Sequence, residues 1–143
     1  MISWETQYEL GIKSIDDQHK ELVNIINKMA ALLIEAKQGV DIYDEVVAVI
    51  GDLKKYTIYH FKYEENLFDQ YSYEYKDTHK AEHDKLVNDI EELDLSSFDE
   101  DQIKHTNDLL KFLITWLFKH ISGSDFLYRD LLNGPKEIMF SSK

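Results

Sequence analysis

The sequence predicts an all-α protein: an antiparallel up-down-up-down four-helix bundle preceded by an extended N-terminal arm. Apolar residues recur every three or four positions along four long stretches, which is the spacing of an amphipathic helix. Only a few residues separate consecutive stretches, and short links favour antiparallel neighbours. The chain has 5 glycines and 1 proline, whereas sandwiches and barrels use many of both in their turns. A helical bundle is therefore the simplest fold for this chain.

A chain of 143 residues is expected to form one domain. We assign the arm to residues 1–15, the bundle to about 16–122 and a C-terminal segment to 123–143. The N-terminus has no apolar signal-peptide core, and no stretch is long and apolar enough to span a membrane, so we expect a cytoplasmic protein.

The first two helices are expected at about 16–37 and 41–70, with Gly39 ending the first. The inward face of the first carries His19, Leu22, Val23, Ile26, Ala30 and Leu33. The inward face of the second carries Val46, Val49, Leu53, Thr57, His60, Glu64 and Leu67. Both patterns are typical of helices that pack one side against a core.

The third and fourth helices are expected at about 76–93 and 99–121, after links at 71–75 and 94–98. The inward face of the third carries His79, His83, Leu86, Val87 and Ile90. The inward face of the fourth carries Leu109, Leu113, Trp116, Leu117 and His120. Asp125 follows His120 by five residues across Gly123, which suits a helix end that unwinds and turns the carboxylate back.

Composition excludes several classes of function. The chain has no cysteine, so disulfides, thiolate zinc sites, iron–sulfur clusters and thiol nucleophiles are absent. The net charge is −12, and a protein this acidic is repelled by nucleic-acid phosphates and anionic lipid. We therefore expect neither a nucleic-acid partner nor a membrane partner.

Histidines and carboxylates lie on the inward faces among leucine and valine. His60 and Glu64 are one helical turn apart, and so are His79 and His83. Such groups are costly to bury unless they are paired or bind a metal ion. One histidine alone would more often be a hydrogen-bonded core residue, but here every expected helix contributes at least one such group. The remaining histidine, His105, is expected to be structural or exposed.

Five imidazoles and two carboxylates suit a borderline metal such as iron, because calcium and magnesium prefer oxygen ligands. So many ligands indicate two ions, and a bundle core can hold a carboxylate-bridged pair. If both carboxylates and one oxide or hydroxide bridge two octahedral irons, one position stays open. It lies on whichever iron has only two histidines, and an open position is suited to one small ligand.

The same residues resemble the hemerythrin family, and the bacterial hemerythrins in particular, over nearly the whole chain from Trp4 to about residue 128. The resemblance rests on Trp4 and Tyr8, the run Gly-Ile-Lys-Ser-Ile-Asp-Asp-Gln-His at 11–19, His-Phe-Lys-Tyr-Glu-Glu at 60–65, His79, His83, Trp-Leu-Phe-Lys-His-Ile at 116–121, and Asp125. It implies one iron on His79, His83 and His120, a second on His19 and His60, and bridges by Glu64 and Asp125.

The resemblance further implies two iron ions with a bridging oxo or hydroxo group, cycling between Fe2+ and Fe3+ as O2 binds and leaves. We expect storage, delivery or buffering of O2 rather than enzymatic turnover, with a possible protein partner that receives O2. Two alternatives stay open. One is an O2 or redox sensor acting through a separate partner, and the other is a di-iron oxidoreductase acting on peroxide or nitric oxide. The oligomeric state also stays open.

Overall fold

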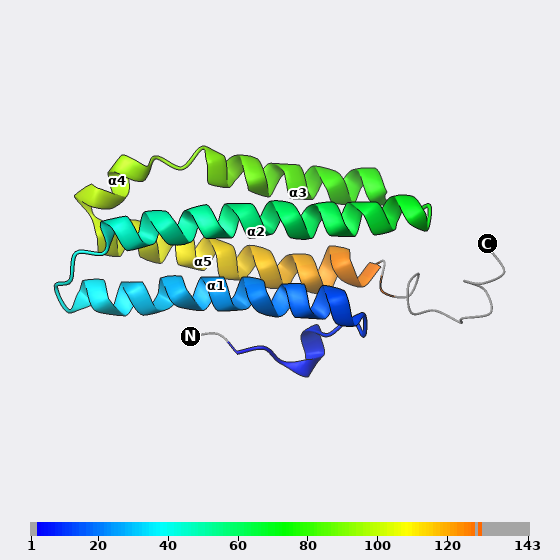
Figure 1. The fold of residues 1–143 in the computed structure, drawn as a ribbon, viewed down its shortest axis with the longest axis horizontal. Coiled ribbons are helices and arrows are strands. Elements are labelled where there is room, and N and C mark those ends of the chain that lie inside the picture. The colour runs from blue at the N-terminus through cyan, green and yellow to red at the C-terminus, as the bar shows by residue number, and fades with distance from the viewer. Residues whose placement is uncertain (1–2, 128, 130–143) are drawn as a thin grey trace.

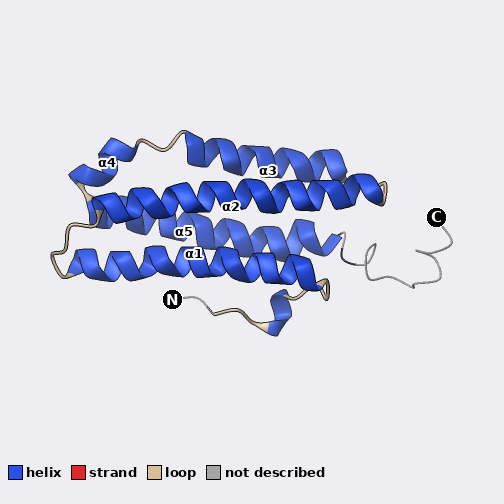
Figure 2. Ribbon diagram, in the orientation of Figure 1, coloured by secondary structure: helices blue, strands red, loops and turns tan. Residues whose placement is uncertain are grey.

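The computed structural model describes residues 3–127 and 129, and it confirms the all-α four-helix bundle (Figure 1). The long helices are α1 (Lys13–Lys37), α2 (Tyr43–Gln70), α3 (Lys76–Glu91) and α5 (Gln102–His120). Each runs opposite to the one before it, α1 packs against α2 and α5, and α2 packs against α3. Every regular element drawn for the described residues is a helix (Figure 2).

The first two helices have the ends that local chemistry favours. Gly39 follows α1 with φ +90°, and the Val40 amide donates to the Glu35 carbonyl at 3.1 Å. Both this end and the end of α2 are Schellman motifs, in which the residue after the helix is left-handed. At the end of α2 a serine takes that position, because Ser72 has φ +50°. The Tyr73 amide then donates to the Phe68 carbonyl at 2.9 Å. This turn brings Tyr73 inward, whereas Tyr75 stays half exposed.

The link between α3 and α5 differs from the expected one. It contains a short helix, α4 (Leu95–Glu100), where a plain link was predicted, and α5 begins at Gln102 rather than near residue 99. Two aspartates explain the break. Asp94 accepts a hydrogen bond from the Ser96 amide at 3.2 Å, and Asp101 accepts one from the Lys104 amide at 3.1 Å. Two successive N-caps start two separate helices.

The N-terminal arm is less extended than predicted. It contains one 3-10 turn, η1 (Thr6–Tyr8), and α1 begins at Lys13, so residues 13–15 belong to the helix. Most of the segment assigned to residues 123–143 lies outside the described residues, as does the end of the resemblance near residue 128.

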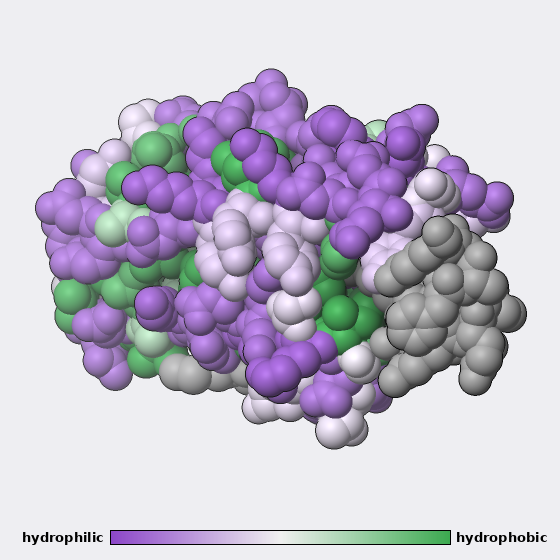
Figure 3. Space-filling model, turned by 45° about the vertical axis from the view of Figure 1, so that its right-hand side comes forward, coloured by the Kyte–Doolittle hydropathy of each residue, from purple (hydrophilic) through white to green (hydrophobic). Residues whose placement is uncertain are grey.

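The core is a stripe along each long helix, slightly rotated from the predicted one. Met29, Ile50 and Phe68 are buried although they were not on the predicted faces. Five residues predicted to point inward are only partly buried because they lie at the edges of the stripe: Ala30, Val49, Leu67, Val87 and Trp116. Hydrophilic residues interrupted by small apolar patches cover the face in Figure 3. Among the described residues, no helix is long and apolar enough to cross a membrane.

Candidate metal centre

All seven residues singled out in the sequence meet in one place. They lie at the end of the bundle where α1 and α3 begin and where α2 and α5 finish (Figure 1). Their ligand atoms form two groups, within each of which the atoms lie no more than 4.8 Å apart. One group is Glu64, His79, His83, His120 and Asp125, and the other is His19, His60 and Glu64.

Asp125 connects histidines from three different helices. Its Oδ1 lies 2.9 Å from His79 Nε2 and 3.1 Å from His120 Nε2. Its other oxygen, Oδ2, lies 3.1 Å from His19 Nε2. The two oxygens of one carboxylate therefore face different histidines of the cluster.

Glu64 makes the second connection. Its Oε1 lies 3.3 Å from His60 Nε2 and 3.2 Å from His83 Nε2. Together the two carboxylates link a set of three histidines (His79, His83, His120) to a set of two (His19, His60). Both carboxylates are completely buried, and none of the five histidines is more than 6% exposed.

A turn of π-helix aims Asp125 at the cluster. The sequence suggested an unwound helix end after His120, but the helix instead widens into η2 (Ile121–Asp125). A π-turn closes hydrogen bonds over five residues, so side chains five apart share a face. This spacing explains how His120 and Asp125 reach the same point. Gly123 has open space where a Cβ would stand, so glycine is not sterically required there.

The donor atoms fit a metal ion better than they fit one another. The buried atoms His19 Nε2, His83 Nε2 and both oxygens of Asp125 lie 2.9–3.2 Å from other cluster atoms. None of them makes a hydrogen bond within the described part of the chain. Buried polar atoms without partners are costly, and converging lone pairs are what a cation relieves. The cluster could therefore hold metal.

The electrostatics keep the carboxylates ionised. Burial and Asp125 raise the pKa of Glu64, but His60 and His83 outweigh them and lower it to about 2. Burial likewise opposes ionisation of Asp125, yet His120, His19 and His79 hold its pKa well below the usual range. Burial lowers the pKa of His60 to about 4, which leaves that imidazole neutral. Glu64, Asp125 and His60 are therefore in the protonation states that metal ligands need.

Three polar residues outside the predicted set contact the outer nitrogens of the histidines. His60 Nδ1 donates to Gln18 Oε1 at 2.6 Å, and His83 Nδ1 donates to Glu65 Oε2 at 3.0 Å. His120 Nδ1 lies 3.5 Å from Glu82 Oε2. In the sequence, Glu65 and Glu82 look like ordinary surface acids. The available signals were that Glu65 directly follows Glu64, in a run that carries the family resemblance, and that Glu82 directly precedes His83.

Aromatic rings stack on the faces of two of the imidazoles. Phe61 stacks on His83, and Trp116 stacks on His120 with centroids 4.4 Å apart and planes at 15°. The apolar residues Ile15, Leu22, Leu113 and Leu117 are also buried. The cluster therefore lies within a largely apolar core.

The N-terminal arm covers the cluster from the side of α1. The Asp16 carboxylate accepts hydrogen bonds from the amides of Leu10 at 2.8 Å and Gly11 at 3.1 Å. Further along the arm, the Trp4 ring lies 6.2 Å from the His19 ring, and the Tyr8 ring lies 4.3 Å from that of Phe118. The arm therefore lies next to His19, which belongs to the set of two histidines.

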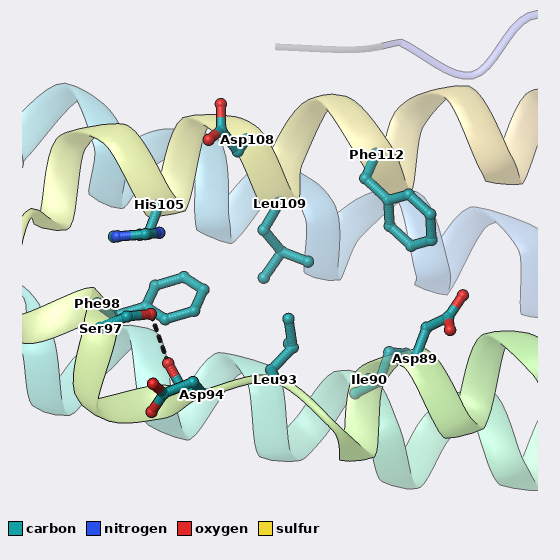
Figure 4. Close-up of a pocket in the computed structure, with 10 residues that line it drawn as sticks. All are labelled: Asp89, Ile90, Leu93, Asp94, Ser97, Phe98, His105, Asp108, Leu109 and Phe112. Atoms are coloured by element: carbon teal, nitrogen blue, oxygen red, sulfur yellow. Dashed lines mark hydrogen bonds between the residues drawn. The ribbon is translucent and has the colours of Figure 1, made fainter.

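A separate hollow lies near α4, at the other end of the bundle. Its volume is about 330 Å³, and its walls come from α3, α4 and α5 (Figure 4). The Phe112 ring points into it and Asp108 points away. His105 also lines it, partly buried, with its ring 5.6 Å from that of Phe98. None of the seven cluster residues lines this hollow.

Comparison with known proteins gives consistent matches. The family model described as hemerythrin HHE cation binding domain matches residues 10–132. A bacteriohemerythrin of Clostridium acetobutylicum is 37% identical over 130 residues, which cover 91% of this chain and all of that protein. A bacteriohemerythrin of Pseudomonas aeruginosa is 33% identical over 89% of this chain and 78% of its own length. A hemerythrin-like protein of Naegleria gruberi is 29% identical over 91% of this chain and 92% of its own.

Proposed function

This chain belongs to the hemerythrin family, and from that premise we propose that its buried cluster holds two iron ions joined by an oxo or hydroxo bridge and binds O2 reversibly. The biological role would be storage, delivery or buffering of O2 in the cytoplasm, with O2 returned unaltered rather than consumed in a reaction. A protein partner that receives the O2 belongs to the same proposal.

One observation carries the proposal: each buried carboxylate faces histidines of both sets. Asp125 lies against His79 and His120 with one oxygen and against His19 with the other. Glu64 lies against His60 and His83. Two bridging carboxylates between three and two histidines would leave one position open on the His19/His60 side. That arrangement supports a pair of ions with one place for a small ligand.

The chemical character of the ligands supports release of O2 rather than its activation. When bound, the two irons would supply the two electrons that O2 takes up and gives back. Imidazoles, which bind a metal ion in their neutral form, outnumber the carboxylates in this cluster. Anionic oxygen ligands stabilise high-valent iron better than imidazole does, so this ligand set favours return to the ferrous state.

The residues around the centre would also keep protons and water away. Ile15 is fully buried, and Leu22 and Leu117 are each only 4% exposed. Displacement of bound O2 by water or protons is a route to irreversible oxidation, and an apolar shell slows it. The arm adds a further layer next to His19 through the Trp4 ring.

An optical titration of the iron-loaded, anaerobically reduced protein with O2 tests the proposal, together with an iron count. We expect two irons per chain and a visible charge-transfer band that rises with O2 and fades on degassing. Immediate conversion to a stable diferric form without such a band would contradict reversible binding and favour an oxidoreductase. A chain that takes up no iron would contradict the metal site itself.

Two histidine variants sharpen this test. His83→Gln removes a buried cluster residue and is expected to lower the iron count and abolish the band. His105→Gln is the matched control, because His105 lies away from the cluster beside Phe98. It is expected to keep both irons and the band.

A further inference from the structure

The outer nitrogens of the cluster histidines meet different chemical groups on the two sides of the centre. On the three-histidine side, His83 Nδ1 donates to the Glu65 carboxylate at 3.0 Å, and His120 Nδ1 lies 3.5 Å from the Glu82 carboxylate. On the two-histidine side, His60 Nδ1 donates to the neutral Gln18 amide at 2.6 Å. His19 Nδ1 is buried and makes no hydrogen bond among the described residues.

This difference changes how strongly each imidazole donates electrons. A carboxylate that accepts the outer N–H pulls its proton outward, so the inner nitrogen becomes a more basic ligand. A neutral amide orients the ring but polarises it much less. An imidazole whose outer nitrogen has no acceptor gains no such effect.

We propose that Glu65 and Glu82 are positioning residues that make the His79/His83/His120 position the tighter metal site and the one that favours Fe3+. Gln18 keeps the opposite position weaker. The inference rests on the two-metal centre of the proposed function and adds an inequality between its two positions. The iron with the open position would thus be the more weakly held and the more easily reduced of the two.

The two carboxylates are expected to contribute unequally. Glu65 is closer to its histidine and is 23% exposed, whereas Glu82 is farther away and 43% exposed. Solvent screens the more exposed carboxylate more strongly. Substitution of Glu65 should therefore have the larger effect.

Anaerobic titration with Co2+ against a competing chelator tests the inference without any O2 chemistry. The wild-type protein is expected to bind two Co2+ in two resolved steps. Loss of a carboxylate behind a histidine ligand typically costs 10–100-fold in metal affinity. We expect Glu65→Gln, and to a smaller extent Glu82→Gln, to lower the Co2+ affinity of the tighter step by about this range. Both variants should leave the affinity of the weaker step nearly unchanged.

Gln18→Glu supplies the opposite change, because it puts a carboxylate behind His60. We expect it to strengthen the weaker step and bring the two steps together, and a gain of affinity cannot result from misfolding. Asp84→Asn is the matched control. Asp84 lies on α3 beside His83, but its carboxylate is 65% exposed and pairs with Lys80. This control should leave both steps at wild-type values.

The reduction potentials of the iron-loaded protein give a second measurement. Removing a carboxylate makes Fe3+ less favourable at the three-histidine position, so Glu65→Gln should raise the potential of the couple assigned to it. Each tenfold fall in the ratio of ferric to ferrous affinity corresponds to about 59 mV for one electron. If Glu65 had only a structural role, its substitution could change this potential only by disturbing the fold, which far-UV circular dichroism would detect. A shifted potential with an unchanged circular dichroism spectrum therefore supports the inference.

The outcomes separate this inference from the proposed function. If the wild type binds two Co2+ but Glu65→Gln and Glu82→Gln behave like Asp84→Asn, the inequality is refuted and the metal centre stands. If both variants weaken the second step rather than the first, the assignment of sides is wrong and the inference fails. If the wild type binds no metal, the proposed function fails and this inference fails with it.

Discussion

The Phe61 ring lies flat against the His83 imidazole, with ring centroids 3.7 Å apart and planes at 3° to each other. Both residues are buried, and they come from different helices, α2 and α3. The phenyl ring therefore fixes the plane of an imidazole that faces Glu64 on its inner edge and Glu65 on its outer edge.

Substitution of Phe61 should separate stability from metal binding. Phe61→Leu is expected to cost about 1–2 kcal/mol of unfolding free energy, from lost packing and lost stacking. It should also lower metal affinity because the imidazole of His83 can rotate. Phe98→Leu is the matched control, since Phe98 is equally buried but lies in α4. Urea unfolding of the metal-free proteins and Co2+ titration measure the two effects. Equal metal affinity in both variants would contradict the positioning role.

Asp16 should control how firmly the arm is held. Its carboxylate accepts two amide hydrogen bonds from the arm, and only one acceptor oxygen remains in Asp16→Asn. One buried amide then loses its partner, which costs about 1–3 kcal/mol. Faster hydrogen exchange at the Leu10 and Gly11 amides measures the effect. Asp17→Asn, which removes an exposed pair with Lys13, should leave exchange unchanged. Unaltered exchange in Asp16→Asn would show that the arm is held by other contacts.

The π-turn should be essential for two-metal binding. Deletion of Gly123 shortens the spacing between His120 and Asp125 from five residues to four and rotates Asp125 by about 100°. The carboxylate then leaves the cluster, and we expect the Co2+ count to fall from two to one or none. Gly123→Ala keeps the spacing and meets open space, so it should keep both ions. Two ions in the deletion variant would argue against Asp125 as a bridge.

The apolar shell should slow irreversible oxidation. Leu22 lies one turn beyond His19 on the inner face of α1 and is buried. Leu22→Thr introduces a hydroxyl that can hold water near the two-histidine side, so the oxygenated protein should oxidise several-fold faster. Leu33→Thr makes the same change on the same helix but roughly 21 Å from His19 along the helix axis, given about 1.5 Å per residue. The decay of the visible band over time measures the oxidation rate of each variant. Equal rates in the two variants would count against shielding by Leu22.

Metal affinity should rise with pH up to about pH 9. Burial lowers the pKa of His83, but the neighbouring Glu64 and Glu65 carboxylates outweigh it and raise the pKa to about 9. Below that pH the metal-free imidazole carries a proton that a metal ion must displace, so affinity should increase about tenfold per pH unit and level off above it. Co2+ titrations at pH 7, 8 and 9 measure the slope. In Glu65→Gln the Co2+ affinity should stop rising at a lower pH than in the wild type. A wild-type affinity that does not change between pH 7 and 9 would contradict competition between the metal ion and a proton on His83.

Much of this molecule could be predicted because its signals are local and periodic. The four helices follow from apolar spacing, and Gly39 marked the end of α1 as expected. The break before α5 was missed because acidic residues at 94–101 suit either a loop or a helix start. Only the capping hydrogen bonds of Asp94 and Asp101 distinguish these possibilities.

The centre was predictable to the extent that buried histidines and carboxylates are unusual on apolar faces. The residues behind the ligands were not, because Glu65 and Glu82 are partly exposed and resemble any surface acid. The π-turn was also missed, since a five-residue spacing alone is compatible with an unwound helix. The contact of Glu65 with His83 joins α2 to α3, and the periodicity of a single sequence does not report contacts between helices.

The cluster draws on both extremes of the chain: His19 lies near the start of α1, and Asp125 follows the end of α5. During synthesis the chain emerges from its N-terminus, so Asp125, one of the two carboxylates that link the two sets of histidines, is the last of the seven residues to be made. A nascent chain that contains only α1, α2 and α3 has four of the histidines and Glu64 but still lacks His120 and Asp125. For the proposed di-iron centre, this order of synthesis makes metal insertion a step that follows translation.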